Sequence, residues 1–227
     1  MSKLAIIIPV LDEGESIAAA LDALADLRAL GAEVIVVDGG SRDATIQRAR
    51  LRADHVISAP HGRALQMNAG TERASGDVLL FLHVDTRLPA DVDHVVLNGL
   101  QRSGRAWGRF DVRIDGRSPL LALVGWLMSM RSRLTGIATG DQAIFVRREA
   151  FQAVGGFPAI ALMEDIALCK RLKGVSRPLC LRERVITSGR RWEKNGVLNT
   201  VVLMWRLRLA YFFGADPEKL AQQYGYE

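Results

Sequence analysis

The sequence is poor in cysteine and has no motif that would use the little it contains. Cys169 and Cys180 are the two cysteines among 227 residues, and no C-x-x-C pair occurs. This pattern excludes a disulfide-stapled scaffold and the common zinc motifs, and it fits a protein of the reducing cytosol. We expect both thiols to be small buried side chains.

Long apolar runs are also missing. A membrane-spanning helix needs about 18 or more consecutive apolar residues. The two best stretches, residues 119–130 and 196–214, are too short or carry Arg206 and Arg208. The apolar run at residues 3–10 is followed by acidic residues, where a secretory signal would have its small-residue cleavage site. We therefore expect a cytoplasmic protein, either soluble or bound peripherally to the inner face of the membrane.

Glycine-rich phosphate loops are a third absence. The sequence contains neither the G-x-G-x-x-G of dinucleotide-binding proteins nor the G-x-x-x-x-G-K-[ST] of a P-loop. Bound phosphates would have to be held by other means. A divalent cation on Asp85 is the natural candidate, because Mg²⁺ and Mn²⁺ prefer oxygen ligands.

The residues that are present predict a folded, basic protein. Hydrophobic residues make up 49% of the chain and charged residues 24%, enough to bury one sizeable core. The formal net charge is +5, which suits phosphorylated ligands, anionic lipid surfaces or nucleic acid. No nucleic-acid-binding module is recognisable, so we expect no nucleic-acid partner.

Predicted strands and helices alternate through the first 88 residues. Apolar runs predict strands over residues 3–10, 32–38, 54–59 and 77–83, with helices over 14–30, 42–52 and 62–75 between them. This order is typical of β-α-β units and a mostly parallel sheet flanked by helices, the α/β class. The later pattern is mixed, with helices over 90–103, 118–134 and 163–173, an edge or half-exposed strand over 106–115, and strands over 142–149 and 178–188.

We expect one domain over residues 1–227, because no linker or repeat divides the chain. Residues 1–88 would form a nucleotide-binding half, 89–192 an acceptor and catalytic half, and 193–227 a helical C-terminal tail.

Polar side chains follow three of the predicted strands. Asp12 and Glu13 follow the first strand, Asp38 and Asp43 the second, and His83 and Asp85 the fourth. The carboxyl ends of parallel strands meet at one edge of a sheet, where ligands bind. A single such aspartate is usually a cap or turn residue. Three acidic strand ends on one edge need a counter-charge, such as a metal ion or an arginine.

Six segments in order carry a resemblance to a known family. They are "IIIPVLDE", "VIVVDGGSRD", "GRALQMNAG", "GDVLLFLHVDT", "GDQAIFVRRE" and "MEDIALCKRL". Together they resemble the family 2 glycosyltransferases of the GT-A fold, over residues 3 to about 192. "HVDT" and "TSGRRW" further resemble a small bacterial subgroup described as radical-SAM/selenodomain-associated or arsenosugar-biosynthesis transferases.

The resemblance implies an inverting, hexosyltransferase-type enzyme with a nucleoside-diphosphate sugar donor and a hydroxyl acceptor, and we expect the donor to be a UDP-sugar. Asp165 corresponds to the general base, with Glu164 beside it, and Asp85 to the ligand of a Mn²⁺ or Mg²⁺ ion. The residues that would bind the nucleotide sugar are Pro9, Glu13, Asp38, Arg63, His83, Asp141, Arg191 and Trp192.

Two positions depart from the family pattern. His83 stands where the D-x-D motif has its first aspartate, and we expect it to contact the donor or a water instead of the metal. Ser188 stands where processive members carry the glutamine of Q-x-x-R-W, which argues against a polymerising enzyme.

Several alternatives stay open at this point. A sugar-phosphate nucleotidyltransferase shares a related core, and a non-catalytic nucleotide-sugar-binding protein could keep the fold. The acceptor is either a small molecule or lipid-linked. The basic, aromatic-rich helix predicted over residues 197–213 suits the core, a homodimer interface or a peripheral contact with a membrane.

Overall fold

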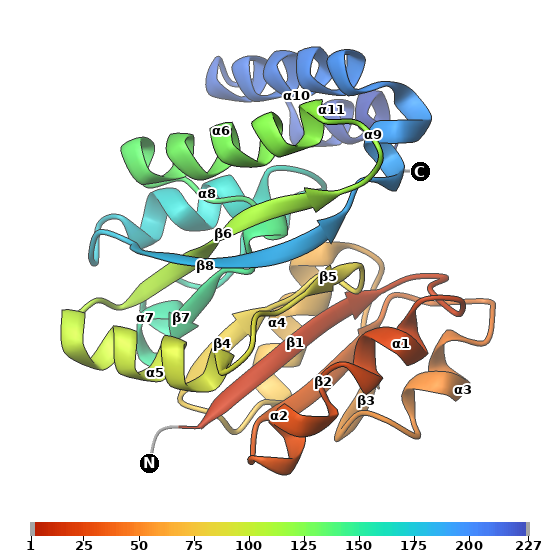
Figure 1. The fold of residues 1–227 in the computed structure, drawn as a ribbon, viewed down its shortest axis with the longest axis vertical. Helices are drawn as coiled ribbons and strands as arrows, with labels where there is room; N and C mark the ends of the chain where they lie inside the picture. The colour runs from red at the N-terminus through yellow and green to blue at the C-terminus, as the bar shows by residue number, and fades with distance from the viewer. Residues whose placement is uncertain (1–2, 226–227) are drawn as a thin grey trace.

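A computed structural model describes residues 3–225, within which one eight-stranded sheet forms the centre of the molecule (Figure 1). The strand order is β3-β2-β1-β4-β7-β6-β8-β5. The strands are β1 (Leu4–Val10), β2 (Glu33–Asp38), β3 (His55–Ser58), β4 (Val78–Phe81), β5 (Thr86–Arg87), β6 (Trp107–Asp115), β7 (Phe145–Arg147) and β8 (Leu179–Ser188).

Most neighbouring strands run parallel, as the sequence predicts. β1 pairs in parallel with β2 and β4, with Ile8 opposite Val36 and Ile6 opposite Leu80. β6 and β8 are also parallel, whereas β7 runs antiparallel to β4 and β6, and β5 antiparallel to β8. The α/β class with a mostly parallel sheet is confirmed.

Helices cover both faces of the sheet, which explains the continuous apolar runs in β1, β2 and β4. α4, α7 and α8 pack on one face, and α1 and α5 on the other. The helices are α1 (Ile17–Asp22), α2 (Ala25–Ala29), α3 (Thr45–Ala49), α4 (Arg63–Arg73), α5 (Val92–Ser103), α6 (Leu120–Thr135), α7 (Arg148–Ala153), α8 (Glu164–Leu172), α9 (Arg190–Asn195), α10 (Val197–Phe212) and α11 (Pro217–Tyr224), with a 3₁₀ turn η1 at Gly140–Gln142.

The C-terminal helices pack beside the start of α8. Leu207 of α10 and Leu220 of α11 form a small apolar cluster with Met163 and Ile166. Figure 1 shows α10 and α6 at the same end of the molecule, above β6 and β8. Among residues 3–225, no helix combines the length and the apolar character needed to cross a bilayer.

Two predicted elements differ from the structure. The helix expected over residues 14–30 is broken into α1 and α2 at Ala23 and Leu24. The strand expected at an edge or half-exposed, β6, is not at an edge, because it lies between β7 and β8. Its second half alternates between buried and more exposed residues, as the half-exposed alternative predicts, whereas Arg109 in its first half is fully buried and pairs with Asp111. β5, α7 and α9 have no counterpart among the predicted elements, and α11 falls within the tail expected to be helical over residues 193–227.

Gly70 allows α4 to approach the sheet closely. A Cβ atom at this position would lie 2.5 Å from Cγ2 of Ile7 in β1 and 2.9 Å from Cγ2 of Val37 in β2. Both neighbours are branched and fully buried, so neither can move aside easily. The glycine therefore fixes the distance between α4 and the strands, and with it the position of Arg63 at the start of α4.

Replacing Gly70 with alanine should destabilise the protein by about 1–3 kcal/mol, because the added methyl group overpacks the core. Urea denaturation followed by circular dichroism measures the change. Glu72→Ala, at an exposed position of the same helix, is the matched control and should stay within about 0.5 kcal/mol of the native protein. Equal stability of Gly70→Ala and the native protein would show that α4 does not pack this closely.

Candidate active site

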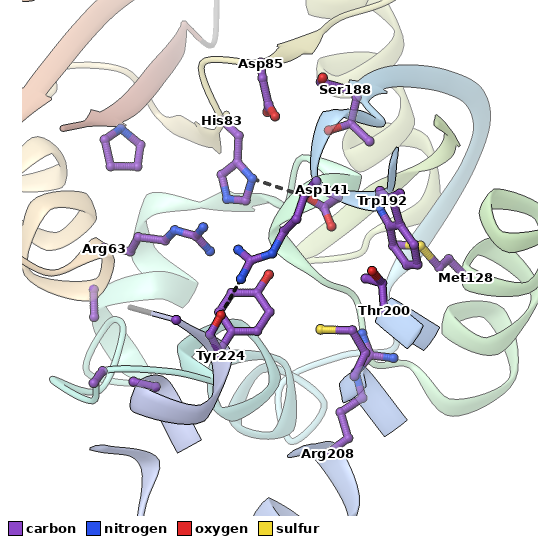
Figure 2. Close-up of a pocket in the computed structure, with 18 of the residues that line it drawn as sticks. Arg63, His83, Asp85, Met128, Asp141, Ser188, Trp192, Thr200, Arg208 and Tyr224 are labelled. Carbon is purple, nitrogen blue, oxygen red and sulfur yellow. Dashed lines mark hydrogen bonds and ion pairs between the residues drawn. The ribbon is translucent and has the colours of Figure 1, made fainter. Parts of the chain in front are cut away.

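A cavity of about 1240 Å³ opens at the carboxyl ends of β1 and β4 (Figure 2). Eight of the eleven residues predicted for the site line it. They are Pro9, Glu13, Arg63, His83, Asp85, Asp141, Arg191 and Trp192. Glu164, Asp165 and Asp38 are not among the lining residues.

His83 and Asp141 form a pair in the wall of the cavity. Nδ1 of His83 lies 3.4 Å from Oδ1 of Asp141, as Figure 2 shows. Burial acts to raise the pKa of Asp141, but the hydrogen bond with His83 and the positive charges of Arg63 and Arg191 outweigh it and lower the pKa. Asp141 is therefore held as a carboxylate.

Gly140 gives the His83 ring its place. A Cβ atom on Gly140 would lie 2.4 Å from Nε2 of His83, so the ring rests directly on the glycine backbone. Nδ1 of His83 is paired with Asp141, whereas Nε2 is only packed against Gly140. That His83 is not a metal ligand stays a prediction.

Asp165 is joined to the same loop. Its Oδ2 accepts a hydrogen bond from the amide N–H of Gly140 at 2.9 Å, and its Oδ1 accepts one from the amide of Ile166 at 2.7 Å. Asp165 is thus hydrogen-bonded to Gly140, the residue that directly precedes the cavity-lining Asp141. Burial raises the pKa of Asp165, while these amide hydrogen bonds and the charge of Arg63 act to lower it.

Glu164 is a buried acid beside Asp165. Its side chain is 5% exposed, and it begins α8 directly after Met163, whose φ of 70° turns the chain into the helix. Burial, reinforced by the negative charge of Asp165, raises the pKa of Glu164 to about 7. The two acids form a coupled pair that holds a proton to higher pH than exposed carboxyl groups would.

Arg63 supplies positive charge to these acids. It begins α4 and lines the cavity. Its charge lowers the pKa of Asp141 and opposes the rise in the pKa of Glu164 and Asp165. One guanidinium therefore contributes positive charge near three carboxyl groups.

The acids at the ends of β1 and β2 are satisfied by backbone amides. Asp12 accepts a hydrogen bond from the amide of Arg42 at 2.7 Å, Asp43 from that of Gly14 at 2.7 Å, and Asp38 from that of Gly40 at 2.9 Å. These bonds hold the β1 and β2 loops together. The counter-charge expected for these acids is thus provided by amide dipoles. The role of Asp38 in binding the nucleotide sugar stays a prediction.

Two residues of the site escape the sequence analysis. Tyr224 of α11 lines the cavity, and the guanidinium of Arg191 lies 3.6 Å from the centre of its ring and donates a hydrogen bond to its carbonyl oxygen. Arg131 of α6 also lines the cavity. Burial lowers the pKa of Arg131, and the charge of Asp165 opposes this. Both residues belong to helices whose sequences show no motif, so no local pattern predicts that they line the cavity.

The site can hold a metal ion only with help from a ligand. Within residues 3–225, no three His, Cys, Asp or Glu side chains converge closely enough to bind one. Asp85 lines the cavity, and its Oδ1 has the Thr86 hydroxyl at 3.4 Å. This donor set fits a divalent cation whose remaining ligands are phosphate oxygens and water.

Comparison with solved structures supports the fold. S. aureus TarS (residues 1–349) matches with a TM-score of 0.64 and 17% identity, over 82% of this chain and 60% of that one. The complex of TarS 1–349 with UDP-GlcNAc matches with a TM-score of 0.66 and 19% identity, over 82% of this chain and 58% of that one. A third match is glucosyl-3-phosphoglycerate synthase from Mycobacterium tuberculosis in complex with Mn²⁺, UDP and phosphoglyceric acid. Its TM-score is 0.60 and its identity 21%, over 81% of this chain and 68% of that one. The chain thus spans about three fifths of the length of TarS 1–349.

A search of curated proteins found no match. The model of the family described as "Glycosyl transferase family 2" matches residues 5–154, about two thirds of the chain. This range includes Pro9, Arg63, His83, Asp85 and Asp141, which the cavity brings together. The chain therefore belongs to glycosyl transferase family 2.

Proposed function

We propose that this protein transfers a sugar, with inversion, from a UDP-sugar to a hydroxyl group of an acceptor, with Asp165 as the general base. TarS was solved with UDP-GlcNAc and the mycobacterial synthase with UDP, which supports a uridine donor for this chain. The "HVDT" and "TSGRRW" segments favour the radical-SAM/selenodomain-associated or arsenosugar-biosynthesis subgroup. A hexose is the sugar that this proposal assigns to the donor.

One observation carries the proposal. The carboxylate of Asp165 is fixed by the amides of Gly140 and Ile166, and the loop of Gly140 also carries Asp141, which pairs with His83 in the cavity wall. A general base must be held within reach of the proton that it accepts. The hydrogen bond from Gly140 holds Asp165 against the loop that carries the cavity-lining Asp141. This bond and the one from the Ile166 amide stabilise the charged form of Asp165.

The reaction follows from these positions. The acceptor oxygen forms a bond to the anomeric carbon, and the bond from that carbon to the diphosphate oxygen breaks on the opposite side. The proton of the hydroxyl passes to Asp165. Arg63 faces the carboxyl groups from the start of α4, where its charge would also stabilise the departing diphosphate.

Asp85 is the residue that would hold a divalent cation, Mn²⁺ or Mg²⁺. A bound cation would offset the negative charge that develops on the diphosphate as it leaves. Mn²⁺ and Mg²⁺ complexes of the mycobacterial synthase, both with UDP, support this assignment.

Asp165→Asn should lower kcat by about 10²–10⁴-fold, the usual contribution of a general base. Asparagine can still accept the hydrogen bond from Gly140, so the loop should keep its position. The measurement is diphosphate release from a panel of UDP-sugars with Mn²⁺ and candidate acceptors, alongside calorimetric titration with UDP. UDP should bind both proteins equally. Unchanged turnover in Asp165→Asn would refute the base, and a native protein that neither binds UDP nor releases it would refute the proposed function.

Asp85→Asn should abolish the effect of Mn²⁺ on nucleotide binding. We expect Mn²⁺ to strengthen UDP binding to the native protein, because the cation joins the carboxylate to the diphosphate. Calorimetric titration with UDP, with and without Mn²⁺, measures this difference. Asp26→Asn, at an exposed position of α2, is the control and should behave as the native protein. A full manganese effect in Asp85→Asn would contradict the assignment.

Glu164→Gln should reduce the loss of stability that accompanies rising pH. The pKa of Glu164 is raised from 4.5 to about 7. Its contribution to stability is therefore complete below about pH 4.5 and is lost as pH rises through about 7. The full shift in pKa corresponds to about 3 kcal/mol of unfolding free energy. Because Glu164 and Asp165 interact, this free energy belongs to the two acids together.

Urea denaturation at pH 5 and pH 8 tests this effect. The difference in unfolding free energy between the two pH values should be smaller in Glu164→Gln than in the native protein. Glu72→Gln, at an exposed position, should keep the native difference. An identical pH dependence in all three proteins would mean that Glu164 titrates as an ordinary exposed carboxyl group.

A further inference from the structure

The cavity is larger than a nucleotide-sugar site requires. Ligand pockets usually occupy about 300–1,000 Å³, and this one occupies about 1240 Å³. Beyond the polar residues around Arg63 and His83, it continues between α6 and α10. In Figure 2, Met128 and Thr200 lie on the side of the cavity away from Arg63. The space left beside a donor would be lined mainly by these two helices.

The walls of this part of the cavity are apolar. α6 contributes Val124, Leu127 and Met128, and α10 contributes Val201 and Met204. We call this part of the cavity the α6–α10 groove. Its apolar lining is unsuited to a polar sugar or peptide acceptor and favours a hydrocarbon chain.

The groove opens onto an exposed apolar surface. Trp126 and Leu127 of α6 and Trp205 of α10 line the cavity and are also 57%, 50% and 64% exposed. Along α10, apolar side chains spaced by four and three residues form one outward stripe, which comprises Leu198, Val202, Trp205, Leu209 and Phe212. A helix with an apolar outer face, tryptophan and flanking arginine is typical of helices that lie in a membrane surface.

Two arginines in the groove have unused hydrogen-bonding groups. Nε and Nη2 of Arg131 and Nε of Arg208 are buried and find no acceptor among the described residues 3–225. Both arginines line the cavity, one on each helix. Buried cationic N–H groups are normally hydrogen-bonded, so these two favour an anionic group as their partner.

The surrounding charge agrees with such a ligand. Arg190, Lys194 and Arg206 are exposed on α9 and α10, next to the apolar stripe. A second copy of this face would bring these cations against one another, whereas anionic lipids would attract them. Charge complementarity therefore favours a membrane lipid over a homodimer.

We propose that the α6–α10 groove binds the apolar chain of a membrane lipid that serves as the sugar acceptor, with an anionic head group of that lipid against Arg131 and Arg208. The inference rests on the proposed transfer reaction, because it assigns the class of its acceptor. The exposed stripe of α10 lies in the membrane surface, and the groove leads from there to the donor site.

The first experiment measures binding of a model amphiphile. Farnesyl phosphate, farnesol and inorganic phosphate are titrated into the full chain while tryptophan emission is recorded, since Trp126, Trp192 and Trp205 line the cavity. Farnesyl phosphate should bind best and shift the emission to the blue. Arg208→Gln should weaken farnesyl phosphate binding by about tenfold, the effect of one charge-assisted hydrogen bond, and leave farnesol binding unchanged.

The second experiment measures membrane binding by flotation with vesicles of phosphatidylglycerol or of phosphatidylcholine. The native protein should bind the anionic vesicles more strongly, and Leu209→Glu should lose this binding. Leu51→Glu is the matched control, because Leu51 is 81% exposed and belongs to the first half of the chain, after α3. Vesicle binding by Leu51→Glu should equal that of the native protein.

UDP titration separates the two proposals. If UDP binds but neither farnesyl phosphate nor anionic vesicles do, the lipid proposal is overturned and the transferase proposal stands. Equal affinity of farnesyl phosphate for Arg208→Gln and the native protein would overturn the head-group assignment. A native dimer that Leu209→Glu converts to a monomer, with no vesicle binding, would show that the stripe is a dimer interface. Failure to bind UDP would count against the transfer reaction alone.

Discussion

The hydrogen bond from the Gly140 amide to Asp165 is the interaction on which the site depends. It joins the loop before β7 to the start of α8, two segments about 25 residues apart in the chain. The same glycine leaves room for the His83 ring, which a side chain at this position would displace. One amide and one missing Cβ atom at Gly140 thus bring Asp165 close to the His83–Asp141 pair of the cavity wall.

A balance of charge follows from this arrangement. Glu164 and Asp165 are buried next to each other, which raises the pKa of both. The charge of Arg63 counters part of this effect, and the His83–Asp141 pair lies in the wall of the cavity that Asp85 also lines. The site keeps its acids in a poorly solvated region at a cost in stability near neutral pH, as is common where carboxyl groups take part in catalysis.

Much of this arrangement is predictable from the sequence, and the reasons are physical. The continuous apolar runs of β1, β2 and β4 indicate strands covered on both faces, and polar residues at their ends mark the edge where the cavity opens. Asp85 and Asp165 follow from the family resemblance. Asp38 accepts hydrogen bonds from Gly40 and Ser41 in its own loop, as a turn residue commonly does. The hydrogen bonds of Asp12 with Arg42 and of Asp43 with Gly14 are not predictable, because they depend on amides about 30 residues away in the chain.

Other features are set by tertiary contacts alone. Tyr224 belongs to a polar C-terminal helix, and only packing against Arg191 brings it into the cavity. Arg131 follows an apolar stretch of α6 and looks like an ordinary surface residue, but the fold places it in the cavity near the charge of Asp165. The helix expected over residues 14–30 contains no proline or internal glycine after Gly14 to announce its break. The conformation at such positions depends on contacts between distant elements of the fold. Local sequence patterns carry no information about those contacts.

The most direct test of the central claim is a crystal structure with a non-hydrolysable UDP-sugar and Mn²⁺. The account predicts manganese bound to Asp85 and to both phosphates, the diphosphate near Arg63, and the anomeric carbon facing the Gly140–Asp165 side of the cavity. A donor bound elsewhere, or one whose anomeric carbon is separated from Asp165 by the protein wall, would contradict it.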